Sequence, residues 1–125
     1  MNRQLNERSK LQIAEQQHGG VVVLTLSGEI RMNDGDLALA RRMDEIVARS
    51  ARQVVLDLAH VSYIDSSGIG RLVAEARRLR QQGTALRLAR LTSRSQQMLA
   101  TLNLKGLFEI YDEVEAAVLS FGRPQ

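Results

Sequence analysis

The segment Asp65-Ser66-Ser67-Gly68 combines a carboxylate, two hydroxyls and a glycine at the point where an apolar run ends and a helical pattern begins. In open α/β sheets, ligands and partners meet the loops at the carboxyl ends of strands, so we expect chemistry at this segment. Gly68 and Gly70 predict a low-profile turn with Ser66 at its tip. A phosphate on Ser66 would add about −1.5 to −2 charge, which the positive N-terminus of the next helix tolerates and a docked partner does not. The segment therefore indicates a switch based on serine phosphorylation.

A purely structural interpretation of the same segment is also open. The side chain of Asp65, or of a neighbouring serine, can accept hydrogen bonds from the free N–H groups in the first turn of the helix, as common helix caps do. The residues alone do not separate Ser66 from Ser67 as the phosphate acceptor, because both hydroxyls lie in this turn.

Enzymatic interpretations of the segment fail on spacing. A P-loop ends in Gly-Lys-Ser/Thr, and the chain has no such tripeptide. A nucleophile elbow needs glycine two residues before the serine, whereas Ile64-Asp65 precedes Ser66. Ser66 could be combined with His60 and either Asp57 or Asp65, but neighbours in sequence rarely meet in triad geometry. His18 and His60 have no partners at ligand spacing, so we interpret both as surface or loop residues and expect no metal or other cofactor.

The composition is that of one globular domain. The chain has 125 residues, 44% of them hydrophobic and 25% charged, and at this size one core buries roughly two thirds of the unfolded surface. The absence of cysteine excludes disulfides and thiolate metal sites. Apolar runs such as Val21–Leu26 are far too short to span a membrane, and the polar start Met1–Lys10 does not resemble a secretory signal. We therefore expect a cytoplasmic protein without membrane insertion.

The charge pattern does not favour nucleic acid as a partner. The net charge is only +3, and the basic residues are scattered along the chain. With two Tyr, two Phe and no Trp, the chain lacks the aromatic platform on which single-stranded bases stack. We expect no direct nucleic-acid binding.

Hydrophobic periodicity predicts alternating strands and helices. Two apolar runs separated by Gly19-Gly20 indicate a β-hairpin, and the apolar run at 53–58 is short enough for a buried central strand. Residues 85–89 alternate and fit a strand parallel to it across a right-handed crossover. The predicted strands are 11–16, 21–27, 53–58, 85–89 and 107–111, and the predicted helices are 36–49, 69–81, 93–102 and 113–120.

These elements predict an α/β fold in the order ββαβαβαβα. The sheet is expected to be mixed and mostly parallel, with about five strands and about four helices. We expect one domain over residues 11–120, preceded by a flexible segment at 1–10 and followed by a tail at 121–125.

Four landmarks in the chain resemble those of one bacterial family, in the same order. Residues 54–58 (Val-Val-Leu-Asp-Leu) followed by 61–70 (Val-Ser-Tyr-Ile-Asp-Ser-Ser-Gly-Ile-Gly) resemble the central motif of the anti-sigma factor antagonists, which are STAS domains. The other three landmarks are Ser27-Gly28-Glu29-Ile30, Gly83 to Leu88 and Leu102 to Ile110, which resemble the family's Gly-Glu-(Ile/Leu), return-strand and closing Gly-Leu segments. The resemblance covers about residues 11–120 and implies a STAS-like fold.

The resemblance implies a partner-switching protein that is not itself an enzyme. The unphosphorylated protein would bind an anti-sigma factor and so free a sigma factor for transcription. The anti-sigma factor is usually a serine kinase that uses ATP to phosphorylate the position of Ser66, and a PP2C-type phosphatase reverses the step. The partner-binding residues implied in this way are Glu29, Arg31, Asp65, Ser66, Ser67, Gly68 and Gly70, with the loop from Glu29 to Asp34 beside the acceptor.

Arg31 departs from the family pattern, since members commonly carry an aspartate there. The reversed charge lies on the loop expected to face the partner, where a like-charge contact can cost several kcal/mol. Either the partner carries the complementary charge or the protein is not a conventional kinase substrate; a merely solvated Arg31 is also open.

Two other functions stay open. The first is a STAS scaffold or accessory subunit of a lipid transporter in which Ser66 is never phosphorylated. The second is a small-ligand or nucleotide sensor that uses the crevice at the strand ends. The sequence does not determine the oligomeric state.

Overall fold

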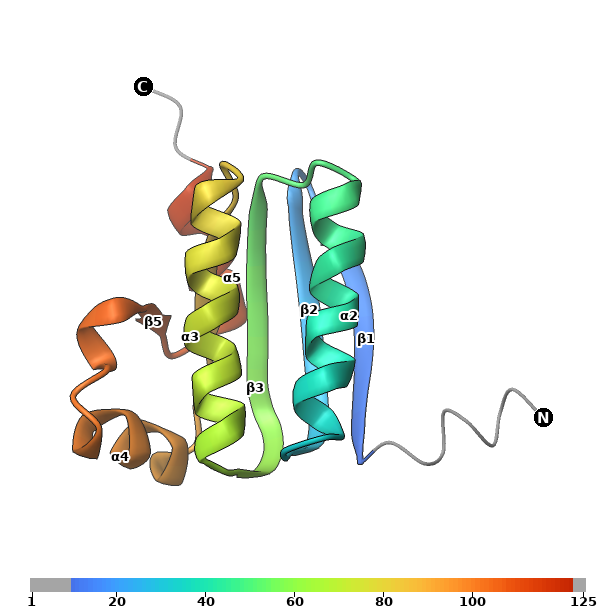
Figure 1. The fold of residues 1–125 in the computed structure, drawn as a ribbon. Coiled ribbons are helices and arrows are strands. Elements are labelled where there is room, and N and C mark those ends of the chain that lie inside the picture. The colour runs from blue at the N-terminus through green and yellow to red at the C-terminus, as the bar shows by residue number, and fades with distance from the viewer. Residues whose placement is uncertain (1–9, 123–125) are drawn as a thin grey trace.

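The computed structural model describes residues 10–122, which form one five-stranded sheet flanked by helices (Figure 1). The elements in chain order are β1 (Leu11–His18), β2 (Val21–Ile30), α2 (Gly35–Ala48), β3 (Gln53–Ile64), α3 (Ser66–Gln81), β4 (Ala85–Ala89), α4 (Ser93–Thr101), a 3-10 helix (Lys105–Leu107), β5 (Glu109–Tyr111) and α5 (Val114–Phe121). The predicted α/β class and the order ββαβαβαβα are confirmed. Positions 1–9 of the predicted flexible segment and 123–125 of the predicted tail lie outside the described residues.

The sheet is mixed and mostly parallel, as predicted. β1 and β2 form an antiparallel hairpin in which His18 pairs with Val21, and Gly19 supplies the positive φ of 63° that the tight turn requires. β2, β3, β4 and β5 follow one another across the sheet in parallel pairs. The carboxyl ends of these four strands therefore point in one direction.

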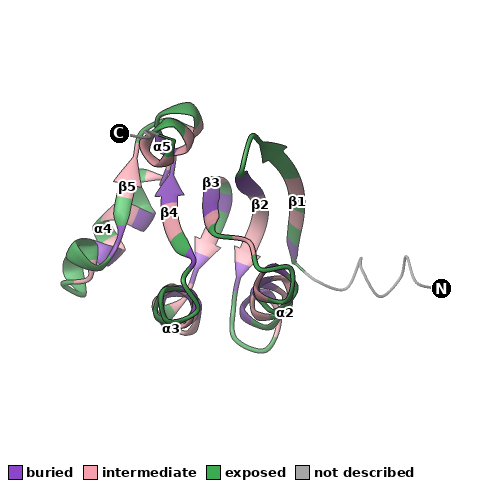
Figure 2. Cartoon of the chain, turned by 90° about the horizontal axis from the view of Figure 1, so that it is seen from above, coloured by how far each residue is buried: buried purple, intermediate pink, exposed green. Residues whose placement is uncertain are grey.

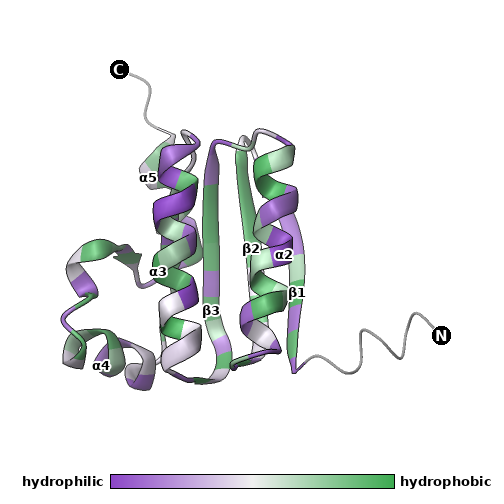
Figure 3. Cartoon of the chain, in the orientation of Figure 1, coloured by the Kyte–Doolittle hydropathy of each residue, from purple (hydrophilic) through white to green (hydrophobic). Residues whose placement is uncertain are grey.

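Helices cover both faces of the sheet: α2 and α3 lie on one face and α5 lies on the other (Figure 2). Alternate residues of a strand point to opposite faces, so Leu24 and Leu56 belong to the core beneath α2 and α3 while Val23 and Val55 belong to the smaller core with α5. The first half of β3 is accordingly almost continuously hydrophobic (Figure 3), as a strand buried on both faces must be.

β2 and β3 extend further than the apolar runs predicted. The two strands remain paired as far as Ile30 and Ile64, even though His60 and Ser62 are exposed. The continuation depends on backbone pairing, which the polar side chains do not interrupt. The loops that follow these two strands consequently start side by side at the same edge of the sheet.

Two further boundaries differ from the prediction. α3 begins at Ser66, three residues before the predicted start at Ile69, because Asp65 caps its first turn. β5 holds only Glu109–Tyr111, because Lys105–Leu107 forms a 3-10 helix in place of the start of the predicted strand. The short β5 leaves part of the β4 edge without a neighbouring strand.

Candidate functional site

Asp65 joins the two loops at the carboxyl ends of β2 and β3. One oxygen of its carboxylate accepts a hydrogen bond from the Gly68 N–H at 2.8 Å, which caps α3, and the other accepts one from the Met32 N–H at 3.1 Å. The Gly68 N–H is the main cause of a pKa of Asp65 below the usual value for the group, and the Met32 N–H and the Arg31 charge act in the same direction. The helix cap considered from the sequence is thus the carboxylate of Asp65. The loop at 29–34 lies beside the start of α3, where the sequence analysis expected it.

The capping by Asp65 leaves the Ser66 hydroxyl free. Ser66 is the first residue of α3 and is exposed, and no group among residues 10–122 hydrogen-bonds its hydroxyl. Ser67 is half-buried. Of the two hydroxyls that the sequence left equivalent, the one on Ser66 is the more accessible to another protein.

The two glycines of the segment differ in their surroundings. A Cβ on Gly68 would lie 2.5 Å from the Ile30 carbonyl oxygen and 2.7 Å from Cγ1 of Ile64, whereas a Cβ on Gly70 would meet nothing within 4 Å. Gly68 is buried, and its lack of a side chain lets the first turn of α3 pack against the end of β2. Gly70 is exposed and keeps the helix surface low next to Ser66.

Arg31 is held in a defined position beside this helix start. Its Nε donates to a Glu29 carboxylate oxygen at 2.7 Å, and its guanidinium lies 4.0 Å from the centre of the Tyr63 ring. The hydrogen bond to Glu29 is the main cause of a raised pKa for Arg31. Glu29 and Tyr63 are paired across β2 and β3, so strand pairing fixes the direction in which the Arg31 charge is presented.

Comparisons with known proteins identify the fold that carries this surface. Residues 12–117 match the family described as STAS domain. The chain belongs to the STAS domain family. The family resemblance drawn from the sequence landmarks is thereby confirmed.

This STAS domain is similar to proteins named as anti-sigma factor antagonists. It is 29% identical over 107 residues to the anti-sigma F factor antagonist of Paenibacillus polymyxa, a match that covers 85% of this chain and 92% of the relative. A crystal structure of an anti-sigma factor antagonist from Mycobacterium paratuberculosis superposes with a TM-score of 0.75 at 26% identity, covering 88% and 92% of the two chains. The Bacillus protein SpoIIAA in its phosphorylated form shares the fold with a TM-score of 0.67 at 18% identity, covering 89% and 98%.

Two exposed apolar residues of this STAS domain, on the loop after β2 and at the start of α2, were not predicted by the sequence analysis. The side chain of Met32 is 60% exposed next to Asp65, and that of Leu37 is 40% exposed in the first turn of α2. The exposure of Leu37 could have been predicted from the sequence, because Leu37 lies outside the apolar stripe of its helix. For Met32 the exposure depends on the loop conformation, which the sequence does not show.

The histidine and aspartate considered for a hydrolytic triad do not meet Ser66. Asp57 is buried and forms two hydrogen bonds with the guanidinium of Arg90, at 3.0 and 2.8 Å. His60 is exposed and pairs with Ser27 across β3 and β2. Within residues 10–122, no His, Asp and Glu cluster suits a metal ion, and no helix is long and apolar enough to cross a membrane.

Proposed function

We propose that this STAS domain is an anti-sigma factor antagonist that binds an anti-sigma factor while Ser66 is unphosphorylated and releases it when Ser66 carries a phosphate. The observation that carries the proposal is the exposed, unbonded Ser66 hydroxyl at the first position of α3, directly beside the loop that Asp65 ties to it. The names of the similar proteins from Paenibacillus and Mycobacterium support the same class of partner.

The phosphorylation step requires an external kinase, which we propose is the anti-sigma factor itself. The Ser66 oxygen attacks the γ-phosphorus of ATP, ADP leaves, and the hydroxyl proton passes to a base of the kinase. Asp65 is adjacent but unsuited as that base, because both of its oxygens accept backbone N–H groups and its pKa is lowered. A PP2C-type phosphatase would hydrolyse the phosphoserine and restore the binding form.

The phosphate acts on the interface while the fold stays intact. At the first position of α3 it lies at the positive end of the helix, which favours an anion. Asp65, the residue next to Ser66, bonds the loop that carries the exposed side chain of Met32, and we propose that Met32 and the exposed Leu37 contact the partner. A partner that covers them would have to desolvate the phosphate, and that cost opposes binding.

Arg31 is proposed to select the partner. Because Glu29 and Tyr63 hold its guanidinium in place, its charge is presented in one direction and costs little further ordering when it is bound. We expect an acidic residue on the facing surface of the anti-sigma factor. Arg31→Asp should then reduce the association rate, whereas the reverse change in the partner should restore it.

The test compares two serines in equivalent positions. Ser66 and Ser93 are both exposed first residues of helices, α3 and α4, so Ser66→Asp and Ser93→Asp add the same charge to the same kind of position. Tagged wild-type protein and both variants are used to capture proteins from the native host, followed by mass spectrometry. We expect wild type and Ser93→Asp to capture an ATP-binding anti-sigma factor that Ser66→Asp does not.

A second step tests the chemistry with the captured kinase. Incubation with ATP should phosphorylate wild-type protein on Ser66, and Ser66→Ala should remain unmodified. Equal capture of one partner by all three proteins, without an effect of ATP, would instead identify a STAS scaffold or transporter subunit that does not switch.

A further inference from the structure

A groove lies along the outer edge of β4, near the C-terminal end of α3 and away from Ser66 at the start of that helix. Its volume is about 280 Å³, and it is open to solvent between the end of α3 and the 3-10 helix. β5 pairs only with Arg87, Leu88 and Ala89 of β4, so Ala85 and Leu86 have no strand on their outer side within residues 10–122. The missing strand is what leaves the groove open.

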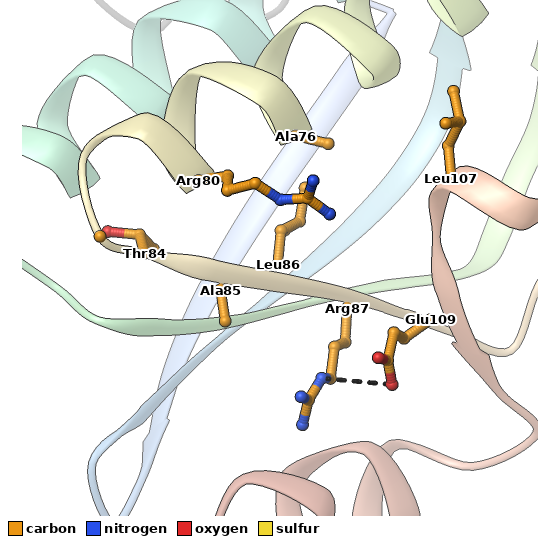
Figure 4. Close-up of a pocket in the computed structure, with 9 residues that line it drawn as sticks. Ala76, Arg80, Thr84, Ala85, Leu86, Arg87, Leu107 and Glu109 are labelled. Atoms are coloured by element: carbon orange, nitrogen blue, oxygen red, sulfur yellow. Dashed lines mark ion pairs between the residues drawn. The ribbon is translucent and has the colours of Figure 1, made fainter.

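Apolar and charged side chains line the groove together. Figure 4 shows Arg80 on α3 close to Leu86 and Ala76, with Leu107 across the hollow from them. A second hollow of about 70 Å³ shares Ala76, Arg80 and Leu107 and adds the apolar side chains of Val73 and Phe108. Leu107 is 45% exposed, so this surface could still bury apolar area against a ligand.

The charges around the groove are mostly basic. Glu109, the carboxylate in its lining, pairs with Arg87 at 3.8 Å (Figure 4). Among residues 10–122 no carboxylate lies within 4.0 Å of the Arg77 or Arg80 guanidinium, and both side chains are exposed. Arg71 and Arg78, on the same helix, both pair with the buried Glu75. Arg71 and Arg78 are thus paired within α3, whereas Arg77 and Arg80 line the groove without an acidic partner among residues 10–122.

We propose that this groove binds an extended acidic segment of a partner protein. One apolar side chain of the segment fills the space between Leu86 and Leu107, and flanking carboxylates pair with Arg77 and Arg80. The unpaired Arg77 and Arg80 select acidic side chains, and the exposed Leu107 selects a peptide with an apolar side chain over a bare anion such as phosphate, which would leave Leu107 uncovered.

The groove and the serine site can be occupied together. Ser66 begins α3 and Arg80 lies in its last turn, so the helix rise of 1.5 Å per residue separates them by about 21 Å. A partner held at Arg80 does not need to touch Ser66. The proposal therefore does not depend on the phosphorylation switch.

Peptide binding tests the proposal directly. The probe is a fluorescein-labelled peptide with two acidic residues on each side of a central leucine, and the measurement is fluorescence anisotropy at low salt with the whole chain. We compare the double variant Arg77→Glu/Arg80→Glu with Arg41→Glu/Arg94→Glu, which changes the net charge equally at exposed arginines outside the groove. We expect saturable binding that weakens about tenfold in the first variant and is retained in the second.

A second peptide and a second readout separate the possible outcomes. A peptide with serine in place of leucine should bind more weakly, and amide chemical shifts should change at Ala85, Leu86 and Leu107. Equal weakening by both double variants, equal binding of both peptides, or binding only to vesicles of anionic lipid would overturn the proposal. Ser66→Asp should bind the peptide as wild type does, so this result is independent of the proposed switch.

Discussion

Removing the carboxylate of Asp65 should destabilise the protein by a predictable amount at neutral pH. Asp65→Ala deletes the cap of α3, an interaction that contributes about 1 kcal/mol in comparable helices. It also deletes the bond to the Met32 N–H, for which about 0.5 kcal/mol is reasonable because water can replace it. We therefore expect the free energy of unfolding at pH 7 to fall by about 1 to 2 kcal/mol. Asp65→Asn keeps one acceptor oxygen and should lose about half as much.

The same bonds predict how this difference depends on pH. The folded-state pKa of Asp65 is lowered, chiefly by the Gly68 N–H, so its contribution to stability is present above the unfolded pKa of about 3.9 and is lost as the pH falls through the folded value. Urea unfolding followed by far-UV circular dichroism, from pH 7 down to about pH 3, should show the gap between wild type and Asp65→Ala narrowing only below about pH 4. Equal stabilities at pH 7, or a gap that widens on acidification, would refute this account of the site.

Three further predictions concern the free energy of unfolding, and each is measured by urea unfolding. Gly68→Ala should destabilise the protein by about 2 kcal/mol, because the new Cβ would collide with backbone. Gly70→Ala should stabilise it by about 0.5 to 1 kcal/mol, because the new Cβ enters open space. Changes of stability in the same direction would contradict this prediction. Arg90→Leu should lower the free energy of unfolding by about 3 kcal/mol, because it leaves the Asp57 carboxylate, only 5% exposed, without its partner. Asp57→Asn should cost less, because the charge it leaves unpaired is on Arg90, which is 38% exposed. The reverse order would be inconsistent with the geometry. Ser66→Asp should change stability by less than about 0.5 kcal/mol, because an anion is favoured at a helix start; a larger loss would attribute any binding defect to unfolding.

The element order was predictable because the signals are local. The helix at α2 shows its apolar residues at helical spacing, and the buried strand β3 shows a continuous apolar run over residues 54–56. Its extension to Ile64 was not predictable in this way. Residues 60 and 62 are exposed and polar, and the strand continues there only because β2 lies alongside.

The candidate site was predictable in part for the same reason. Asp65, Ser66 and Gly68 lie within four consecutive residues, so a helix start with a capping residue could be inferred from their types alone. The contacts made by Arg31 could not be inferred. Its partner Tyr63 is 32 positions away in the chain, and only the pairing of β2 with β3 brings them together.

The sequence by itself determined the family, the order of the elements and the segment that we propose carries the phosphate acceptor, because periodicity, turn chemistry and motif spacing act over a few residues. The tertiary structure decided which hydroxyl is accessible, why Gly68 and Gly70 differ, and where β4 is left without a neighbour. These properties depend on which distant segments pack together. The burial of a side chain and the availability of its polar groups depend on the residues that surround it in the folded protein, so no single stretch of chain specifies them.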